Sequence, residues 1–270
     1  MMTKPPKMTA ADTFAIGGDL VVNRMGYGAM RLTGQPANFG PYPDWDAGKA
    51  LLRRAAELGV NFFDTARAYG PHWNERLLGE ALEGYPQAVI ATKGGIAKLS
   101  PTQLLRDASP GALSRHIDDA LAALRTDRVD LFQLHWVDPN TPIEVSVAAL
   151  AEAQAAGKIR HIGLSNVSVD ELRAAQAVAP IASVQNRYNV RERDQDAMID
   201  VTAAEGIAFI PYGPLGAHPM KPGAPLATAA GQGTRTGAQT ALRALLDRAP
   251  NIIVIPGTTS ITHLEENVRA

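Results

Sequence analysis

The sequence predicts an α/β protein in which eight strand–helix pairs form a single (β/α)8 barrel. Short apolar runs alternate with longer segments in which apolar residues recur at helical spacing. The runs are apolar throughout, which is typical of strands in a parallel sheet buried on both faces. The length of 270 residues suits one such barrel. A doubly wound open sheet is the alternative, but it predicts a glycine-rich turn leading straight into the first helix. A loop rich in Pro, Gly and Asn stands there instead.

The elements alternate regularly along the chain. A β-hairpin over residues 14–22, with Gly17-Gly18-Asp19 at its turn, precedes the first barrel strand. The predicted strands cover residues 24–30, 60–63, 88–92, 129–134, 159–164, 181–184, 207–210 and 252–255. The predicted helices cover residues 46–58, 74–82, 110–124, 142–156, 169–178, 193–205, 236–248 and 262–270.

Capping residues set several of these boundaries. Asp46 and Asn74 are predicted N-caps, because their side-chain oxygens can accept a hydrogen bond from a free backbone N–H. Gly59, Gly157 and Gly206 are predicted to end helices, since glycine adopts the left-handed conformation without strain.

Two connections are longer than the rest. Residues 98–107 are predicted to form a loop before the third helix. Residues 216–237, rich in Gly, Ala, Thr and Pro, are predicted to be either a lid over a functional site or a mobile link.

Composition favours an ordinary globular protein. Hydrophobic residues make up 46% of the chain and its formal net charge is −1, so neither nucleic acid nor a membrane is expected as a partner. The absence of cysteine excludes disulfides, thiolate metal sites and cysteine nucleophiles. We expect one domain over residues 1–270, with residues 1–12 as a flexible arm that is not a signal peptide, and a cytoplasmic location. The oligomeric state is not predicted.

Three ionisable residues stand at the ends of consecutive predicted strands. Asp64 follows the second strand, Lys93 the third and His135 the fourth, and Tyr69 lies in the loop after Asp64. Because the carboxyl ends of barrel strands share one face, these four side chains are expected to lie close together.

The chemistry of this group favours proton donation to a carbonyl oxygen. Asp64 would keep the Lys93 ammonium charged, and the ammonium would lower the pKa of Tyr69 by stabilising its phenolate. Tyr69 could then act as a general acid, while a neutral His135 orients the same oxygen. There is no activated serine or cysteine and no evident set of metal ligands. A hydride from a nicotinamide is therefore the expected attacking group.

Seven short motifs, each at the end of a predicted strand, add to this pattern. They are Asp64-Thr65-Ala66 with Tyr69-Gly70, Thr92-Lys93, His135-Trp136, Gly163-Leu164-Ser165-Asn166, Gln185-Asn186-Arg187-Tyr188-Asn189, Tyr212-Gly213-Pro214-Leu215-Gly216, and Ile255-Pro256-Gly257-Thr258-Thr259 with His263-Leu264-Glu265-Glu266-Asn267. Together they resemble the aldo-keto reductase superfamily over essentially the whole chain. The resemblance implies a (β/α)8 barrel that reduces carbonyl compounds with NADPH.

By the same resemblance, Tyr69 is the general acid, Lys93 and Asp64 adjust its acidity, and His135 positions the substrate carbonyl. The resemblance also implies a set of cofactor contacts. They are Ser165, Asn166 and Gln185 for the carboxamide, Tyr212 for stacking on the nicotinamide, Leu215 and Gly216 for the pyrophosphate, Thr258, Thr259 and Ser260 for the adenosine phosphate with His263 as a nearby cation, and Glu266 and Asn267 for the adenine. Gly213 and Gly257 are expected as further cofactor contacts in the same loops.

Two departures from the family pattern concern cofactor and substrate. The loop after the eighth strand lacks the Lys or Arg that many relatives use for the 2′-phosphate, so NADH is expected as a possible cofactor beside NADPH. The chain ends at Ala270, so a C-terminal tail that shapes the substrate pocket in many relatives is expected to be missing.

The substrate is expected to be a small carbonyl compound. Met30, Trp73 and Trp136 are the expected substrate contacts. The sequences at 26–30, 69–72 and 256–259 are similar to a bacterial branch of the superfamily that includes pyridoxal reductases, which makes pyridoxal a candidate substrate.

Two other functions stay open at this point. A Schiff-base lyase could use Lys93 as its nucleophile, although Asp64 would keep that amine protonated. A regulatory barrel could bind the nucleotide and report redox state with little turnover.

Overall fold

The computed structural model describes residues 12–216, 226–228, 231 and 233–270 of the chain. Nearly all of the predicted arm over residues 1–12, and much of the predicted lid or link over residues 216–237, lie outside the described residues.

A parallel sheet of seven strands forms the centre of the molecule. Its strands are β3 (Tyr27–Gly28), β4 (Phe62–Asp64), β5 (Val89–Gly94), β8 (Val129–Leu134), β9 (Ile159–Ser165), β10 (Ser183–Gln185) and β11 (Ala208–Phe209). They pair in the order β11-β10-β9-β8-β5-β4-β3, so neighbours in the sheet are also neighbours among the barrel strands of the sequence. The predicted strand order is therefore confirmed for seven strands.

The predicted eighth strand, residues 252–255, pairs with each of its neighbours through a single bridge only. Single parallel bridges join Phe209 to Ile252 at one edge of the sheet and Met25 to Val254 at the other. Pro256 has no N–H to donate, so the pairing does not continue past this short segment. The prediction of a barrel closed by eight strands is thus confirmed only in part.

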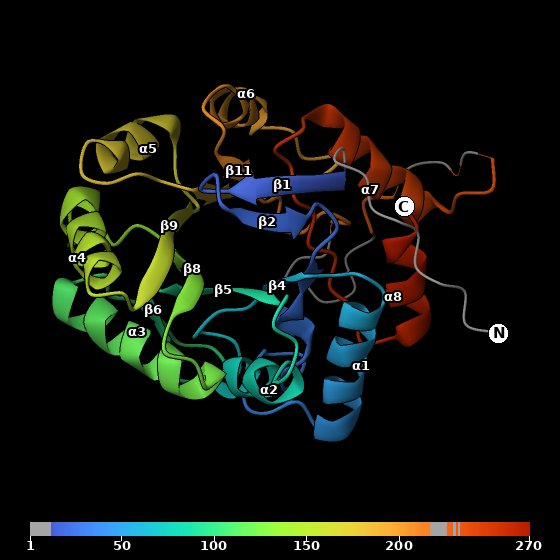
Figure 1. Ribbon diagram of the computed structural model, residues 1–270, viewed down its shortest axis with the longest axis horizontal. Helices are drawn as coiled ribbons and strands as arrows, with labels where there is room; N and C mark the ends of the chain where they lie inside the picture. Colours follow the sequence, from blue (N-terminus) through green and yellow to red (C-terminus); the bar gives the residue numbers. More distant parts are fainter. Residues whose placement is uncertain (1–11, 217–225, 229–230, 232) are drawn as a thin grey trace.

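Eight α-helices belong to the described part of the chain, and Figure 1 shows them arranged around the strands. They are α1 (Trp45–Glu57), α2 (Trp73–Ala81), α3 (Pro110–Leu124), α4 (Ile143–Ala155), α5 (Val169–Gln176), α6 (Asp196–Ala204), α7 (Gly237–Arg248) and α8 (Ile261–Val268). None of these helices is long and apolar enough to cross a membrane.

The N-terminal hairpin covers one end of the barrel. Strands β1 (Thr13–Ile16) and β2 (Leu20–Asn23) pair as predicted, and Figure 1 shows them crossing in front of the sheet. At the turn, Asp19 accepts hydrogen bonds from Arg160 and pairs with His161, both near the start of β9. The hairpin therefore covers the amino ends of the strands and leaves their carboxyl ends to the site.

Two predicted caps are wrong. Asp44, not Asp46, caps α1 by accepting a hydrogen bond from the N–H of Ala47. Helix α2 begins after His72, which has a left-handed backbone with φ of 62°. Asn74 lies inside that helix and is buried, because its amide donates to the carbonyls of Ala29 and Leu32 and so holds the turn after β3.

The predicted loop over residues 98–107 is also wrong. A second hairpin, β6 (Ile96–Lys98) and β7 (Leu104–Arg106), occupies this connection, with Lys98 paired to Leu104. Both strands have three residues and every side chain of β7 is exposed, so the sequence carries no strong strand pattern here.

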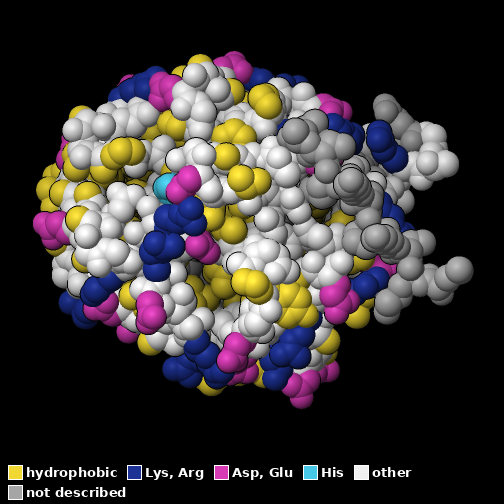
Figure 2. Space-filling model, in the orientation of Figure 1, with side chains coloured by type: hydrophobic (Ala, Val, Ile, Leu, Met, Phe, Trp, Pro, Cys, Tyr) yellow, Lys and Arg dark blue, Asp and Glu magenta, His cyan; other side chains and the backbone are white. Residues whose placement is uncertain are grey.

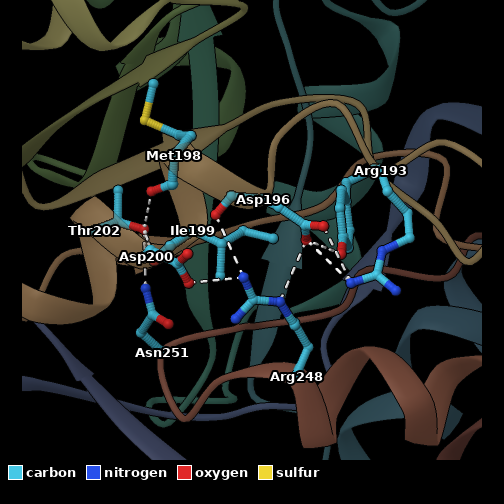
Figure 3. A network of polar contacts seen from close by, with 9 residues as sticks. Arg193, Asp196, Met198, Ile199, Asp200, Thr202, Arg248 and Asn251 are labelled. Atoms are coloured by element: carbon cyan, nitrogen blue, oxygen red, sulfur yellow. Dashed lines mark hydrogen bonds and ion pairs between the residues drawn. The ribbon is translucent and has the colours of Figure 1, made fainter.

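A polar network fixes the start of the eighth segment. Arg248 of α7 donates to Asp200 of α6 at 2.7 Å and pairs with Asp196 at 3.3 Å (Figure 3). Beside it, the buried amide of Asn251 donates to Thr202 at 3.1 Å. These contacts join α6, α7 and the residue preceding Ile252.

On the surface, positively and negatively charged side chains are interspersed over the face shown in Figure 2, which agrees with the formal net charge of −1.

We expect a buried histidine to make the fold acid-sensitive. His116 of α3 accepts a hydrogen bond from the N–H of Gly95, and burial lowers the pKa of this imidazole to about 4. The unfolded chain, with an ordinary histidine pKa, binds a proton between pH 6.5 and 4 that the folded chain does not. Stability from this group is therefore complete above pH 6.5 and falls as the pH drops toward 4, by at most about 3 kcal/mol.

Urea unfolding at pH 7.5 and pH 4.5 tests this. The His116→Gln variant keeps an acceptor for Gly95 but cannot titrate, so it should lose about 2–3 kcal/mol less than the wild type between the two pH values. Equal losses in both proteins would show that His116 does not cause the acid sensitivity.

Candidate active site

A cavity of about 520 Å³ lies at the carboxyl ends of the strands. Most of the sequence-predicted site residues line it. They are Asp64, Tyr69, His135, Ser165, Asn166, Gln185, Tyr212, Gly213, Leu215, Gly257, Thr258, His263, Glu266 and Asn267. Lys93, Gly216, Thr259 and Ser260 are not among the lining residues, although Lys93 lies directly behind the wall.

Asp64 and Lys93 form a buried ion pair at the ends of β4 and β5. Lys93 Nζ lies 2.7 Å from Asp64 Oδ1 and donates a second hydrogen bond to the carbonyl of Thr65 at 2.8 Å. The Lys93 side chain is 1% exposed and that of Asp64 is 3% exposed. Burial lowers the pKa of Lys93, and the Asp64 carboxylate opposes this effect.

Gln185 at the end of β10 completes the shell around that carboxylate. Its amide donates to Asp64 Oδ2 at 2.8 Å, so the two carboxylate oxygens have separate partners. The sequence predicted Gln185 as a cofactor contact and did not predict this bond. Gln185 lines the cavity as well, and the hydrogen bond joins opposite sides of the barrel.

The loop after β4 places Tyr69 beside the ammonium. Lys93 Nζ lies 5.3 Å from the centre of the Tyr69 ring. Gly70 has a φ of 81°, and a Cβ there would lie 2.7 Å from the carbonyl oxygen of Gly40, so this position requires glycine. The N–H of Gly70 also donates to the carbonyl of Asn38. These contacts set the direction of the tyrosine.

The acidity of Tyr69 differs from the sequence-based expectation. Burial raises the pKa of the phenol well above its usual value, and the Asp64 carboxylate adds to the rise. We expected Lys93 to lower this pKa, but desolvation outweighs the ammonium here. The phenol therefore carries its proton throughout the neutral range.

His135 stands at the end of β8, opposite Tyr69. The two ring centres are 6.0 Å apart and the rings are nearly perpendicular, at 85°. Burial lowers the pKa of His135 well below its usual value, and the charge on Lys93 lowers it further. The imidazole is therefore neutral, and its buried Nδ1 has no hydrogen-bond partner among the described residues. A neutral imidazole can donate one hydrogen bond to a carbonyl oxygen in the cavity.

Amide and hydroxyl groups line the neighbouring wall. Asn166, with a left-handed φ of 59°, donates to the carbonyl of His135 and accepts a hydrogen bond from the hydroxyl of Tyr212 at 2.8 Å. Ser165 accepts another hydrogen bond from the same amide. These contacts orient Asn166 and bring residues from three strand ends into one polar surface.

The loop before α8 forms the far end of the cavity. The hydroxyl of Ser260 caps α8 by accepting from the N–H of His263, and Thr258 accepts from the N–H of Ser260. The carbonyl of Thr258 is fixed in turn by the hydroxyl of Tyr27 at 2.5 Å. The helix amino terminus favours an anion at this end.

Of the three expected substrate contacts, two line the cavity. Met30 and Trp136 lie in its wall, whereas Trp73 packs edge-on against Trp45 and is not among the lining residues. Sequence reasoning missed several other lining residues, which come from the loops after β3 and β4 and from the β6–β7 hairpin. They are Asn38, Ala68, Ile96, Lys98 and Leu104.

Comparison with known proteins agrees with the family resemblance of the sequence motifs. The sequence profile described as the Aldo/keto reductase family matches residues 24–222. Pyridoxine 4-dehydrogenase of Escherichia coli is 41% identical over 268 residues, which cover 97% of this chain and 93% of that protein. An uncharacterized oxidoreductase of Schizosaccharomyces pombe is 40% identical over 274 residues, covering 100% and 89%.

Solved structures have the same architecture. A glycerol dehydrogenase from Gluconobacter oxydans superposes with a TM-score of 0.84 at 25% identity, covering 97% of this chain and 91% of that one. An aldo/keto reductase from Klebsiella pneumoniae, in complex with NADP and acetate, superposes with a TM-score of 0.77 at 23% identity, covering 96% and 89%. At 23% identity, the similarity to the Klebsiella pneumoniae enzyme shows a shared fold alone.

Proposed function

Because the chain belongs to the aldo/keto reductase family and is an oxidoreductase, we propose that it reduces an aldehyde or ketone to an alcohol with NADPH. One observation carries the proposal. A buried Asp64–Lys93 pair lies beside a protonated Tyr69 and a neutral His135 at one wall of a single cavity.

Each of the four residues has a separate role in the protonation of the carbonyl oxygen. Tyr69 holds a proton at neutral pH and donates it to the oxygen as negative charge develops there. Lys93 stabilises the phenolate that is left, because its buried ammonium lies 5.3 Å from the centre of the Tyr69 ring, where little water screens the attraction. Asp64, fixed by Lys93 and Gln185, keeps that ammonium charged and in place. The neutral His135 donates a hydrogen bond to the same oxygen and orients the carbonyl.

The donor set on the adjoining wall fits a nicotinamide cofactor, which supplies the hydride when bound. Asn166 and Ser165 offer amide and hydroxyl groups that match a carboxamide, and Tyr212 offers an aromatic ring. The cap of α8 and the loop at Thr258 suit a phosphate.

Arg31 would supply the phosphate-binding cation that the last loop lacks. It lines the cavity, and its side chain lies next to Gly257. No carboxylate of the described residues forms an ion pair with it. An anionic cofactor would therefore meet an available guanidinium.

Pyridoxal is the first substrate to test. The relative from Escherichia coli is named pyridoxine 4-dehydrogenase, and the oxidation of pyridoxine is the reverse of pyridoxal reduction. Trp136 and Met30 give the cavity a flat apolar wall that suits an aromatic aldehyde.

The competing functions have less support. In a Schiff-base lyase Lys93 would act as a neutral amine, but its ion pair with Asp64 and its bond to Thr65 occupy the ammonium. A regulatory barrel with little turnover would need no proton donor. The placement of a protonated Tyr69 beside Lys93 and His135 in the cavity would then serve no purpose.

NADPH titration followed by a turnover assay tests the proposal. Binding should quench the fluorescence of Trp136, and the Arg31→Ala variant should bind NADPH about ten- to hundredfold more weakly because a charge-assisted hydrogen bond is lost. Arg125→Ala, at an exposed position paired with Glu80, is the matched control and should bind like the wild type. Wild-type protein that binds NADPH but reduces neither pyridoxal nor a panel of aldehydes would support the regulatory alternative instead.

A further inference from the structure

The β6–β7 hairpin presents one face to the cavity. Ile96 pairs with Arg106 and Lys98 pairs with Leu104, and directly opposed residues of an antiparallel pair project from the same side. Residues two apart on a strand also share a side, so all four belong to one face. Ile96, Lys98 and Leu104 line the cavity, and the guanidinium of Arg106 lies 4.2 Å above the ring of Trp136. We refer to these four residues as the inner face of the hairpin.

Lys98 is the cation of this inner face that lies in the cavity wall. Its ammonium donates to the carbonyls of Ala37 and Asn38, in the loop that also contacts Gly70. An ammonium has three N–H donors, so one remains after these two bonds. The loop contacts hold the ammonium in a fixed position at the cavity wall.

The charge of Lys98 is not balanced within the described part of the chain. No carboxylate of those residues forms an ion pair with Lys98, or with Arg106 on the same face. Partial burial also lowers the pKa of Lys98, which an anion nearby would reverse. A partly desolvated cation with a spare donor is a binding element for an anion.

The wall around this cation is apolar. Met30, Ala68, Ile96, Leu104 and Trp136 line the same cavity as Lys98. A carbonyl compound held by Tyr69 and His135 would therefore meet hydrocarbon and aromatic surface, with positive charge at the hairpin. A neutral substrate would leave this charge unused.

We propose that the inner face of the hairpin selects carbonyl substrates that carry an anionic group, with Lys98 as the main contact and Arg106 as a second cation. The anionic group, such as a carboxylate, would accept the remaining N–H of Lys98 while the carbonyl lies at Tyr69. This inference rests on the proposed carbonyl reduction and names the substrate class of that same site.

A matched pair of aldehydes tests the proposal. 4-Carboxybenzaldehyde and its methyl ester have similar size but differ in charge, and the ester is the intrinsically more reactive aldehyde, so a preference for the carboxylate cannot come from reactivity. Wild-type enzyme should reduce the carboxylate with a kcat/KM about tenfold or more above that of the ester, since a hydrogen bond to a charged group is involved. Lys98→Met should remove this preference by lowering kcat/KM for the carboxylate alone, and Lys98→Arg should keep most of it.

Two controls separate selectivity from structure. Lys158→Met removes an exposed lysine that pairs with Asp118 and should leave both kcat/KM values unchanged. The preference of the wild type should also shrink at high ionic strength, because added salt screens the attraction. The ester serves as an internal control for any loosening of the loop at Ala37.

The possible outcomes are distinct. If wild-type enzyme reduces both aldehydes equally well, or if Lys98→Met lowers both by the same factor, the inference is wrong while carbonyl reduction stands. In the second case Lys98 serves only to tie the hairpin to its neighbouring loop. If wild-type enzyme binds NADPH but reduces neither these two aldehydes nor any in the panel, the proposed function fails and this inference fails with it.

Discussion

Tyr69→Phe is expected to lower kcat by about 10²–10⁴-fold, the usual contribution of a general acid, while NADPH affinity stays within about twofold of the wild type. The substitution removes one hydroxyl and keeps the ring that packs beside Lys93 and His135. No hydrogen bond of the Tyr69 hydroxyl to a described side chain is broken, so the fold should be unaffected. Turnover should therefore be lost without a loss of binding.

The pH dependence of the wild type supplies a second readout. Tyr69 must be protonated to donate, and burial raises its pKa, so titration of Tyr69 should not lower kcat until the pH exceeds the ordinary tyrosine range near 10. A fall in kcat at lower alkaline pH would instead report loss of the Lys93 ammonium, whose pKa is lowered by burial. His135 must be neutral, and its pKa is lowered, so the acid limb should lie below pH 6.5. Tyr85→Phe, at a position outside the cavity, is the control and should leave kcat unchanged. A Tyr69→Phe enzyme with wild-type kcat would exclude Tyr69 as the proton donor.

Sequence patterns were sufficient for elements that are fixed by local chemistry. Helix α3 begins at Pro110 and ends at Leu124 as predicted, because Ser109 caps it and proline fits the first helical position. Strand β8 also has its predicted bounds, since four of its six residues, Val129, Leu131, Phe132 and Leu134, are apolar and too few to form a helix. Such boundaries depend on neighbours in the chain.

Elements that depend on distant contacts were not predictable. Asn74 is a plausible cap from sequence, but the carbonyls of Ala29 and Leu32 draw its amide into the interior. Both strands of the hairpin at residues 96–106 are short and its second strand is exposed, so neither length nor periodicity distinguishes it from a loop. The eighth strand is apolar enough in sequence, yet only its position between β11 and β3 reveals that it pairs through single bridges.

The features of the candidate site also fall into those that the sequence predicts and those that depend on distant contacts. Strand-end positions brought Asp64, Lys93 and His135 together from sequence alone, because adjacent parallel strands share a rim. The bond from Gln185 to Asp64 spans the barrel between residues 121 positions apart, and no spacing in the sequence indicates it. Likewise the raised pKa of Tyr69 follows from burial, which is known only once the cavity walls are in place.

Lys93→Met is expected to have the largest effect on stability, because it removes one partner of a buried ion pair. Asp64 would remain buried with its charge opposed only by the amide of Gln185. Breaking a buried pair in this way costs about 3–5 kcal/mol, and turnover should also be lost because the ammonium beside Tyr69 is gone. Urea unfolding and kcat for the same aldehyde measure the two effects.

The double variant Lys93→Met/Asp64→Asn separates stability from catalysis. It removes both charges and leaves an amide oxygen that can still accept from Gln185, so most of the lost stability should return. Turnover should not return, since no cation stabilises the phenolate of Tyr69. Arg54→Ala, which breaks a partly exposed pair with Glu265, is the control and should cost no more than about 1 kcal/mol. If the double variant were as unstable as Lys93→Met, the instability would come from lost packing of the lysine stem rather than from an unpaired charge, and if it regained turnover, the role of Lys93 beside Tyr69 would be wrong.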